Sequence, residues 1–217
     1  IKVGNFKLFE LLIKKLPIVS RWQNRLLKFY WNEKYFSELL KRLEGNLDID
    51  PFVVSKDHKI YLRMKKENPD KMIAGRSYRE ILSRYENKLQ NPRLTKTGKY
   101  TAKVIKEFLK IKTPLKDAPD RLNKFFKKYN LGITVGRGFF PVTNFSQKNL
   151  KYEFSASNGR GKEVDYYDSF NFSINIKLKN KTINYITGGR YNNMAQKNLG
   201  LKKIPAVGAA INLGIYE

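Results

Sequence analysis

The chain contains no cysteine and only one histidine, His58, among its 217 residues. The absence of cysteine excludes disulfides and thiolate metal sites. A single histidine makes a histidine-rich metal site or a serine–histidine triad hard to build, so we predict no metal and no cofactor. No hydrophobic run approaches the roughly 18 apolar residues of a membrane span, and no signal peptide is visible. We therefore expect no membrane association and a cytoplasmic location.

Acidic residues are also scarce, with 19 Asp and Glu against 44 Lys and Arg, which gives a net charge of +25. Such a charge points to a polyanion: RNA, DNA, an acidic protein or an anionic membrane surface. The basic residues are spread throughout the chain, and no arginine-rich block, zinc-finger spacing or aromatic RNA-recognition motif is present. This distribution favours lysines on solvated helix faces, and a nucleic-acid partner is not expected.

The first part of the chain has the apolar periodicity of helices. Apolar stripes at helical spacing run over 6–16, 22–30 and 35–43. Pro17 ends the first stripe, and Ser20 is a candidate N-cap for the second. We expect these stripes to form the core of the protein rather than a ligand site.

The next part is less regular. Residues 45–75 are interrupted by prolines and a glycine and show no clear pattern. Ser77 and Glu80 have capping-box spacing at the start of a further apolar stripe. Two more helices are expected over about 95–112 and 117–129.

From about residue 132 the pattern changes to that of strands. Strands are expected over 151–156, 166–178 and 182–187, with a buried strand over 205–213. In the second of these, Phe170 and Phe172 alternate with polar Asn171 and Ser173. Asn180 and Lys181 are predicted to form a hairpin turn. Residues 191–199 are predicted to form a short helix. We therefore predict an α+β fold, with a mostly helical region over 1–131 and antiparallel strands over 132–217.

Three blocks in the strand region carry a family resemblance. The first comprises Phe154 to Arg160 (FSASNGR) and Val164 to Phe170 (VDYYDSF); the second is Gly188 to Tyr191 (GGRY), and the third Ile204 to Gly208 (IPAVG). In this order they resemble the RGLDYYTGxVFE strand, the GGRYD segment and the PAVGFxIGLER strand of the histidyl-tRNA synthetase superfamily. The resemblance implies a class II synthetase-like antiparallel sheet with a histidine pocket.

The residues themselves suit a small amino-acid pocket. A tyrosine hydroxyl can hydrogen-bond an imidazole nitrogen, and glycines in strands let a ligand approach the backbone. Adjacent tyrosines point to opposite sheet faces, so one can enter a pocket while the other packs. By resemblance the pocket comprises Tyr166, Tyr167, Gly188, Gly189, Arg190, Tyr191 and Gly208. Of these, we expect Tyr167, Tyr191 and Gly208 to contact histidine and Arg190 to be structural. The alternative is that the tyrosines are ordinary sheet aromatics.

The sequence departs from the synthetases at three charged positions. The arginine of the first block falls on Lys162 by strict spacing, or on Arg160 if the next two residues are an insertion. The GGRYD aspartate is Asn192. The third-motif arginine, which would contact ATP, falls on Ile215, and this change removes a charge-assisted phosphate contact. These departures predict a site that holds histidine without activating it.

The N-terminal half resembles a narrower family. Ile1 to Leu12 are similar to a VRLGDVGLFxALL segment, Arg21 to Lys28 to a WRRRLxR helix and Ala74 to Ile81 to a GGRSVEEIAER segment. These segments belong to the synthetase-like regulatory subunits of ATP phosphoribosyltransferase. On this alignment synthetase motifs 1 and 2 precede Ile1, so we expect the chain to be the C-terminal part of a longer subunit.

The resemblance implies a non-catalytic role in the first step of histidine biosynthesis. Such a subunit would assemble with the catalytic subunit in a hetero-oligomer, activate it and mediate feedback by L-histidine. Two alternatives remain. A histidyl-tRNA synthetase core fragment would suit the positive charge, since tRNA is a polyanion, and a basic nucleic-acid-binding module would bind RNA independently of histidine.

Overall fold

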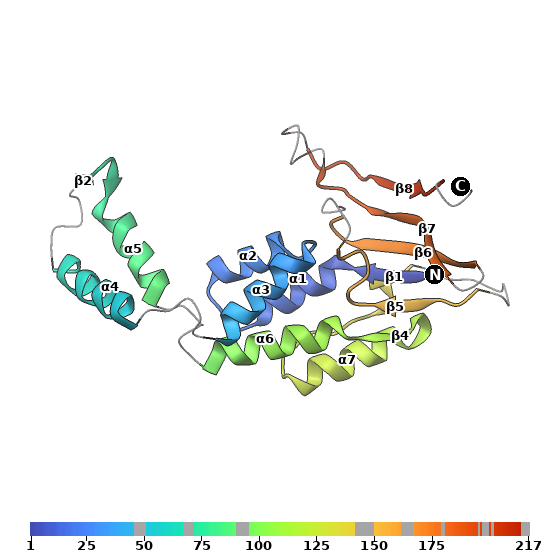
Figure 1. Ribbon diagram of the computed structural model, residues 1–217, viewed down its shortest axis with the longest axis horizontal. Coiled ribbons are helices and arrows are strands. Elements are labelled where there is room, and N and C mark those ends of the chain that lie inside the picture. Colours follow the sequence, from blue (N-terminus) through green and yellow to red (C-terminus); the bar gives the residue numbers. More distant parts are fainter. Residues whose placement is uncertain are drawn as a thin grey trace.

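The chain forms a mixed structure of helices and a mostly antiparallel sheet (Figure 1). The computed structural model describes residues 1–45, 51–66, 72–89, 96–141, 150–161, 167–178, 181–194, 196, 200 and 202–213. The helices are α1 (Phe6–Lys15), α2 (Ser20–Lys28), α3 (Glu33–Glu44), α4 (Pro51–Met64), α5 (Tyr78–Leu89), α6 (Lys96–Leu109) and α7 (Ala118–Lys128). The strands are β1 (Lys2–Asn5), β2 (Met72–Ile73), β3 (Arg76–Ser77), β4 (Lys112–Pro114), β5 (Glu153–Ser155), β6 (Phe170–Leu178), β7 (Lys181–Arg190) and β8 (Val207–Ile211).

The main sheet has the strand order β4-β5-β1-β6-β7-β8. The pairing of β1 with β5 is parallel, and every other pairing in this sheet is antiparallel. Two of its strands, β1 and β4, precede residue 131 and were not expected there. At four and three residues they are too short to show an alternating pattern in sequence. The sheet therefore takes strands from both of the predicted regions.

The C-terminal strands lie close to where the sequence places them. β6 and β7 form the expected hairpin, but Lys181 pairs with Leu178 as part of β7, so the turn does not include Lys181. The expected helix over 191–199 lies largely outside the described residues. The predicted burial of the last strand is wrong: β8 is an edge strand of the described sheet, and Val207 and Ile211 are 69% and 55% exposed.

The helices begin at positions that the sequence partly indicates. The Asn5 side chain ends β1 and caps α1, because its Oδ1 accepts the backbone N–H of Lys7 at 2.9 Å. Ser77 caps α5 as predicted, since its Oγ accepts the N–H of Glu80 at 3.3 Å. Ser20, in contrast, is the first residue of α2 and not its cap. The β1–α1 junction is thus fixed by the side chain of the last residue of β1.

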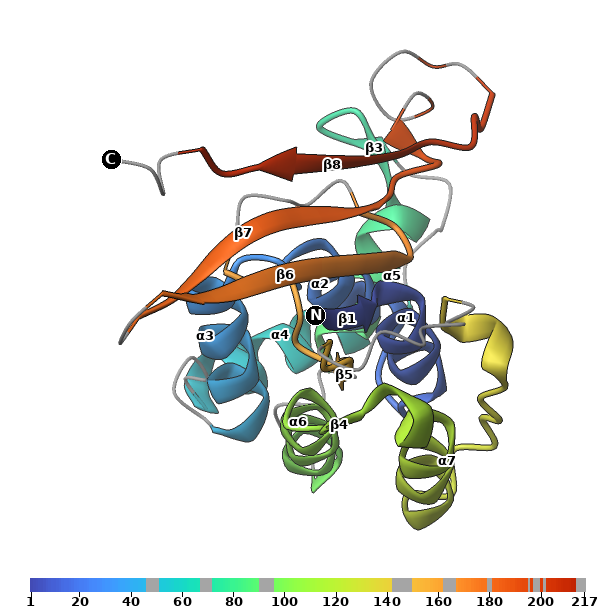
Figure 2. The same cartoon turned by 90° about the vertical axis from the view of Figure 1, so that its right-hand side faces the viewer.

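The core lies where the helical stripes meet the sheet. In Figure 2, α1, α2 and α3 lie behind the strands, on one side of the sheet. Phe9 of α1 is fully buried, with its ring centroid 5.8 Å from that of Phe36 and 6.2 Å from that of Phe108. Phe108 also stacks on Phe126 of α7 at 6.2 Å. The interpretation of the stripes as core is therefore confirmed.

Helices α4 and α5, with the β2–β3 hairpin, extend away from the rest of the protein (Figure 1). The two helices pack on each other, and the Tyr61 hydroxyl donates a hydrogen bond to Glu86 at 2.9 Å. α4 falls in the stretch that showed no clear pattern. Pro51 is its first residue, where a proline loses no helical hydrogen bond. Among the described residues, no helix is long and apolar enough to cross a membrane.

Candidate ligand site on the sheet

Four residues that are paired side by side across four strands of the main sheet include three glycines. The register places Gly4 of β1 opposite Asn171 of β6, Asn171 opposite Gly189 of β7, and Gly189 opposite Gly208 of β8. Residues opposite one another share a sheet face, so this row presents backbone and one amide on that face. Gly4 lies far from the other two glycines in the sequence.

Two tyrosines lie over this glycine row. A Cβ atom on Gly189 would be 2.6 Å from Cδ1 of Tyr167, and one on Gly208 would be 2.6 Å from the hydroxyl of Tyr191. The two ring centroids are 6.4 Å apart. Tyr167 is buried, whereas Tyr191 is half-buried and its hydroxyl donates to the Val207 carbonyl at 3.2 Å. The structure thus brings together four of the seven predicted pocket residues.

These contacts change the role that we expected of the glycines. We expected strand glycines to admit a ligand to the backbone. In the structure Gly189 and Gly208 instead make room for the tyrosine rings. A ligand that reached the backbone of Gly208 would have to displace the ring of Tyr191.

The other predicted residues lie elsewhere. Gly188 is opposite Phe172 on the other face of the sheet, and its Cβ would be 2.6 Å from that ring. The Arg190 side chain is exposed, and its carbonyl accepts the N–H of Asp168 at 3.1 Å. Tyr166 lies outside the described residues. The assignment of histidine contacts to this set stays a prediction.

A buried polar cluster adjoins the tyrosines on the same face. Asn158 donates from Nδ2 to Oδ1 of Asn171 at 2.7 Å, and Ser173 donates to Oδ1 of Asn158 at 2.9 Å. Gly4 is required beneath it, because a Cβ there would lie 2.8 Å from Oδ1 of Asn171. Sequence reasoning missed this cluster, because the alternation of apolar and polar residues in β6 does not show that the polar face is buried. Asn171 and Ser173 are in fact 2% and 4% exposed.

Hydrogen bonds tie the segment after β7 to the start of β8. Tyr191 donates its N–H to the Ala206 carbonyl at 3.0 Å, and Oδ1 of Asn192 accepts the N–H of Ala206 at 3.1 Å. Oδ2 of Asp168 accepts the N–H of Asn193 at 2.7 Å. Asn192 stands where the synthetase motif has aspartate, and its side chain accepts a hydrogen bond from a backbone N–H. These bonds fix the backbone of Tyr191 against the start of β8.

Arg160 is one of the two candidates for the arginine of the first synthetase-like block, and it is held among the helices. Its Nε donates to the Tyr30 carbonyl at 2.9 Å, and its guanidinium carbon lies 4.6 Å from the Phe36 ring centroid. Burial lowers the pKa of Arg160 and raises the pKa of the Tyr30 hydroxyl, which donates to the Ala156 carbonyl at 2.7 Å. The other candidate, Lys162, lies outside the described residues.

We expect replacement of Arg160 with lysine to lower the free energy of unfolding by about 1–2 kcal/mol, because lysine loses the flat stack on Phe36 and the fixed Nε donor. Denaturant titration measures this. The same change at the exposed Arg137 serves as a control and should stay within about 0.5 kcal/mol. Equal stability of the two variants would contradict a packing role for Arg160.

The tyrosine site offers hydrogen-bonding groups. The side chains over the glycine row are neutral, and they can donate and accept hydrogen bonds to a small polar ligand. Among the described residues, no group of three His, Cys, Asp or Glu side chains could hold a metal ion.

Comparison with known proteins gives one consistent result. No family model matches the chain. Three curated proteins named ATP phosphoribosyltransferase regulatory subunit match all of it: 27% identity over 232 residues in Allorhizobium ampelinum, 24% over 235 in Rhizobium meliloti and 26% over 232 in Rhizobium rhizogenes. The chain spans 61% of the length of each of these relatives. The predicted resemblance to regulatory subunits of ATP phosphoribosyltransferase is thereby confirmed.

Proposed function

We propose that this chain is part of a non-catalytic regulatory subunit of ATP phosphoribosyltransferase, which activates the catalytic subunit and mediates feedback by L-histidine. The observation that carries this proposal is the similarity of the whole chain to proteins named as such regulatory subunits. That similarity also favours this function over a histidyl-tRNA synthetase. The isoleucine at position 215, where a synthetase has an ATP-binding arginine, agrees with it.

We further propose a class II synthetase-like fold in which histidine binds at the tyrosine site. The neutral hydrogen-bonding groups over the glycine row support this assignment, because an imidazole offers one donor and one acceptor. Tyr191 is the side chain that would move, since it is half-buried and covers Gly208. Its backbone bond to Ala206 would carry the movement into β8.

Feedback would then be a coupling between two binding events. Histidine would favour the arrangement in which Tyr191 is displaced, and the catalytic subunit would be activated by the other arrangement. Linkage requires that binding of the catalytic subunit change the affinity for histidine by the same factor as histidine changes the affinity for the catalytic subunit.

The test is to add the full-length gene product to the matching catalytic subunit and to follow phosphoribosyl-ATP formation with and without histidine. We expect the rate to rise on addition, and histidine to suppress that rise. An unchanged rate would contradict the proposal, and a tRNA-charging assay would then test the synthetase alternative.

A further inference from the structure

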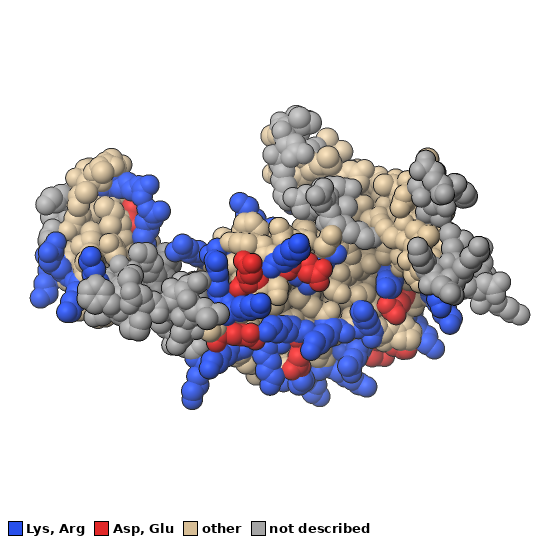
Figure 3. All heavy atoms as spheres, viewed as in Figure 1, with Lys and Arg blue, Asp and Glu red and all other residues tan. Residues whose placement is uncertain are grey.

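The stretch that forms α6, β4 and α7 is rich in positive charge. Residues 96–128 carry eleven Lys and Arg against three Asp and Glu, a net charge of +8. These 33 residues thus hold about a third of the net charge of +25 in 15% of the chain. Figure 3 shows the band of basic side chains along the lower side of the protein, where Figure 1 places α6 and α7. The fold therefore places the basic residues of this stretch along one side of the protein.

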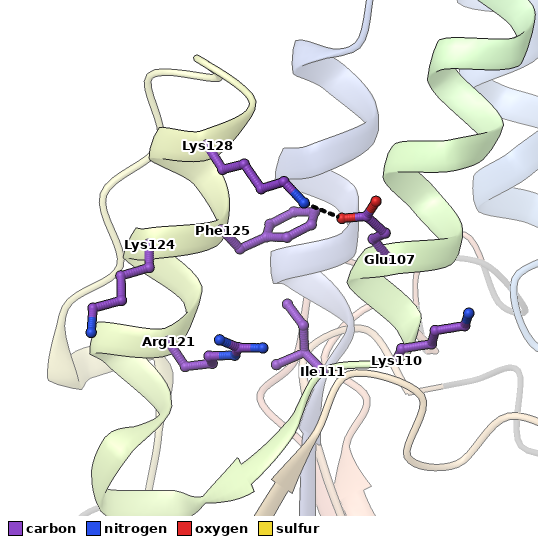
Figure 4. A pocket seen from close by; sticks show the side chains of 7 residues that line it. All are labelled: Glu107, Lys110, Ile111, Arg121, Lys124, Phe125 and Lys128. Carbon is purple, nitrogen blue, oxygen red and sulfur yellow. Dashed lines mark hydrogen bonds and ion pairs between the residues drawn. The ribbon is translucent and has the colours of Figure 1, made fainter.

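A hollow of about 370 Å³ lies between α6 and α7 within this band (Figure 4). Its floor includes Ile111 and Phe125, which are almost fully buried. Lys110, Arg121 and Lys124 surround the floor, and Figure 4 shows Arg121 extending toward Ile111. The hollow thus combines an apolar base with a cationic rim.

Among the described residues that line the hollow, Glu107 is the only one with a carboxylate, and it is paired with a lysine. Lys128 donates to Oε2 of Glu107 at 2.7 Å, and this bond lowers the pKa of the Glu107 carboxyl. Lys110, Arg121 and Lys124 make no ion pair with any residue that the structure describes. Three cations around one apolar floor form a surface that an acidic partner would complete.

We infer that this α6–α7 face is the docking surface for an acidic patch on the catalytic subunit, an inference that rests on the proposed function. Protein interfaces typically place an apolar side chain in a central depression and charged groups at the rim. Complementary charge also steers association and selects the partner. An apolar side chain of the catalytic subunit would fill the hollow, and its neighbouring carboxylates would meet Arg121 and Lys124.

The face suits a protein better than a nucleic acid. Proteins that bind single strands without sequence preference stack bases on exposed aromatic rings. Here Phe108, Phe125 and Phe126 are buried in the core, and the exposed ring of Tyr100 packs against Tyr129 with the ring centroids 6.1 Å apart. Asp117 and Asp120 also lie within the band and would repel a continuous phosphate backbone. Separate carboxylates on a protein surface can avoid those positions.

The test reverses two charges at the rim of the hollow. It compares the effect on binding with that of the same charge reversal on another helix. In the full-length product, R121E together with K124E should weaken binding to the catalytic subunit at least about ten-fold at low salt, mainly through slower association. The deficit should shrink as salt is added, because exposed charges are screened. K34E together with K41E on α3 makes the same charge change at exposed positions and should alter binding less than about two-fold.

The outcomes separate this inference from the proposed function. If the unmodified product neither binds nor activates the catalytic subunit, the proposed function fails. If it does both and the two double variants bind equally well or equally poorly, the docking surface is wrong. Tighter binding of an RNA oligonucleotide than of the catalytic subunit, lost on reversal at Arg121 and Lys124, would assign the face to nucleic acid and would also overturn the inference. Thermal unfolding of each variant checks that it is folded.

Discussion

Replacing Tyr167 with alanine is expected to raise the histidine concentration for half-maximal inhibition of the assembled enzyme by about ten-fold or more. The change removes the buried ring that covers Gly189, together with its hydroxyl. A ten-fold effect corresponds to about 1.4 kcal/mol of lost binding, within reach of one hydrogen bond and its packing. The measurement is a histidine titration of phosphoribosyl-ATP formation. Unchanged histidine sensitivity would remove Tyr167 from the site.

Two control variants separate binding from stability. Truncation of a side chain that is 3% exposed leaves a cavity and should cost several kcal/mol of unfolding free energy, about 3–5 by analogy with other aromatic truncations. Phe172→Ala truncates a ring on the opposite face of the same sheet, against Gly188. It should destabilise the sheet and leave histidine sensitivity unaltered. Tyr167→Phe keeps the ring, so its effect on sensitivity isolates the hydroxyl.

The helices were largely predictable because the buried face of each helix produces an apolar periodicity within its own sequence. Phe9 and Phe36 occur in regular stripes, and local periodicity suffices to assign them to the core. α4 shows the limit of that reasoning. Its proline serves as a helix start, and this cannot be distinguished locally from a break.

The glycine row could not be predicted, because it depends on which strands pair. Gly188 and Gly189 are equivalent in the motif, and the two-residue period only states that they face opposite ways. Which of them lies under a tyrosine is decided by the pairing of β7 with β6 and β8. Gly4 joins the row from the other end of the chain. The burial of Asn171 has the same origin, since it follows from the position of Asn158.

The resemblance singled out Tyr167 and Tyr191, but it did not indicate that they pack on the glycines of the sheet. From the motifs alone, Tyr167 and Tyr191 would contact a ligand. In the structure they contact the glycines that were expected to admit it. The tyrosines and the glycines therefore form one packed unit. A substitution of either a tyrosine or a glycine should alter the packing of the other.

Gly189→Ala should test that unit most directly. The added methyl would lie 2.6 Å from the Tyr167 ring and 2.7 Å from the Phe170 carbonyl oxygen. The ring can shift, but the carbonyl belongs to the neighbouring strand and cannot move without disturbing the pairing. We expect a loss of about 1–3 kcal/mol in unfolding free energy and a reduced response to histidine. The same change at Gly136, where a methyl meets nothing within 4 Å, should be neutral or slightly stabilising.

A double-mutant cycle would divide this cost between the ring and the carbonyl. If the Tyr167 ring is the main obstacle, Gly189→Ala should cost clearly less in a Tyr167→Ala background, because the methyl then occupies vacated space. If the cost is the same in both backgrounds, the strand carbonyl sets it and the tyrosine is not packed on the glycine in solution. That second result would contradict the packed unit and, with it, the mechanism in which displacement of a tyrosine links histidine to β8. Denaturant titration of the four proteins in the cycle is sufficient to decide.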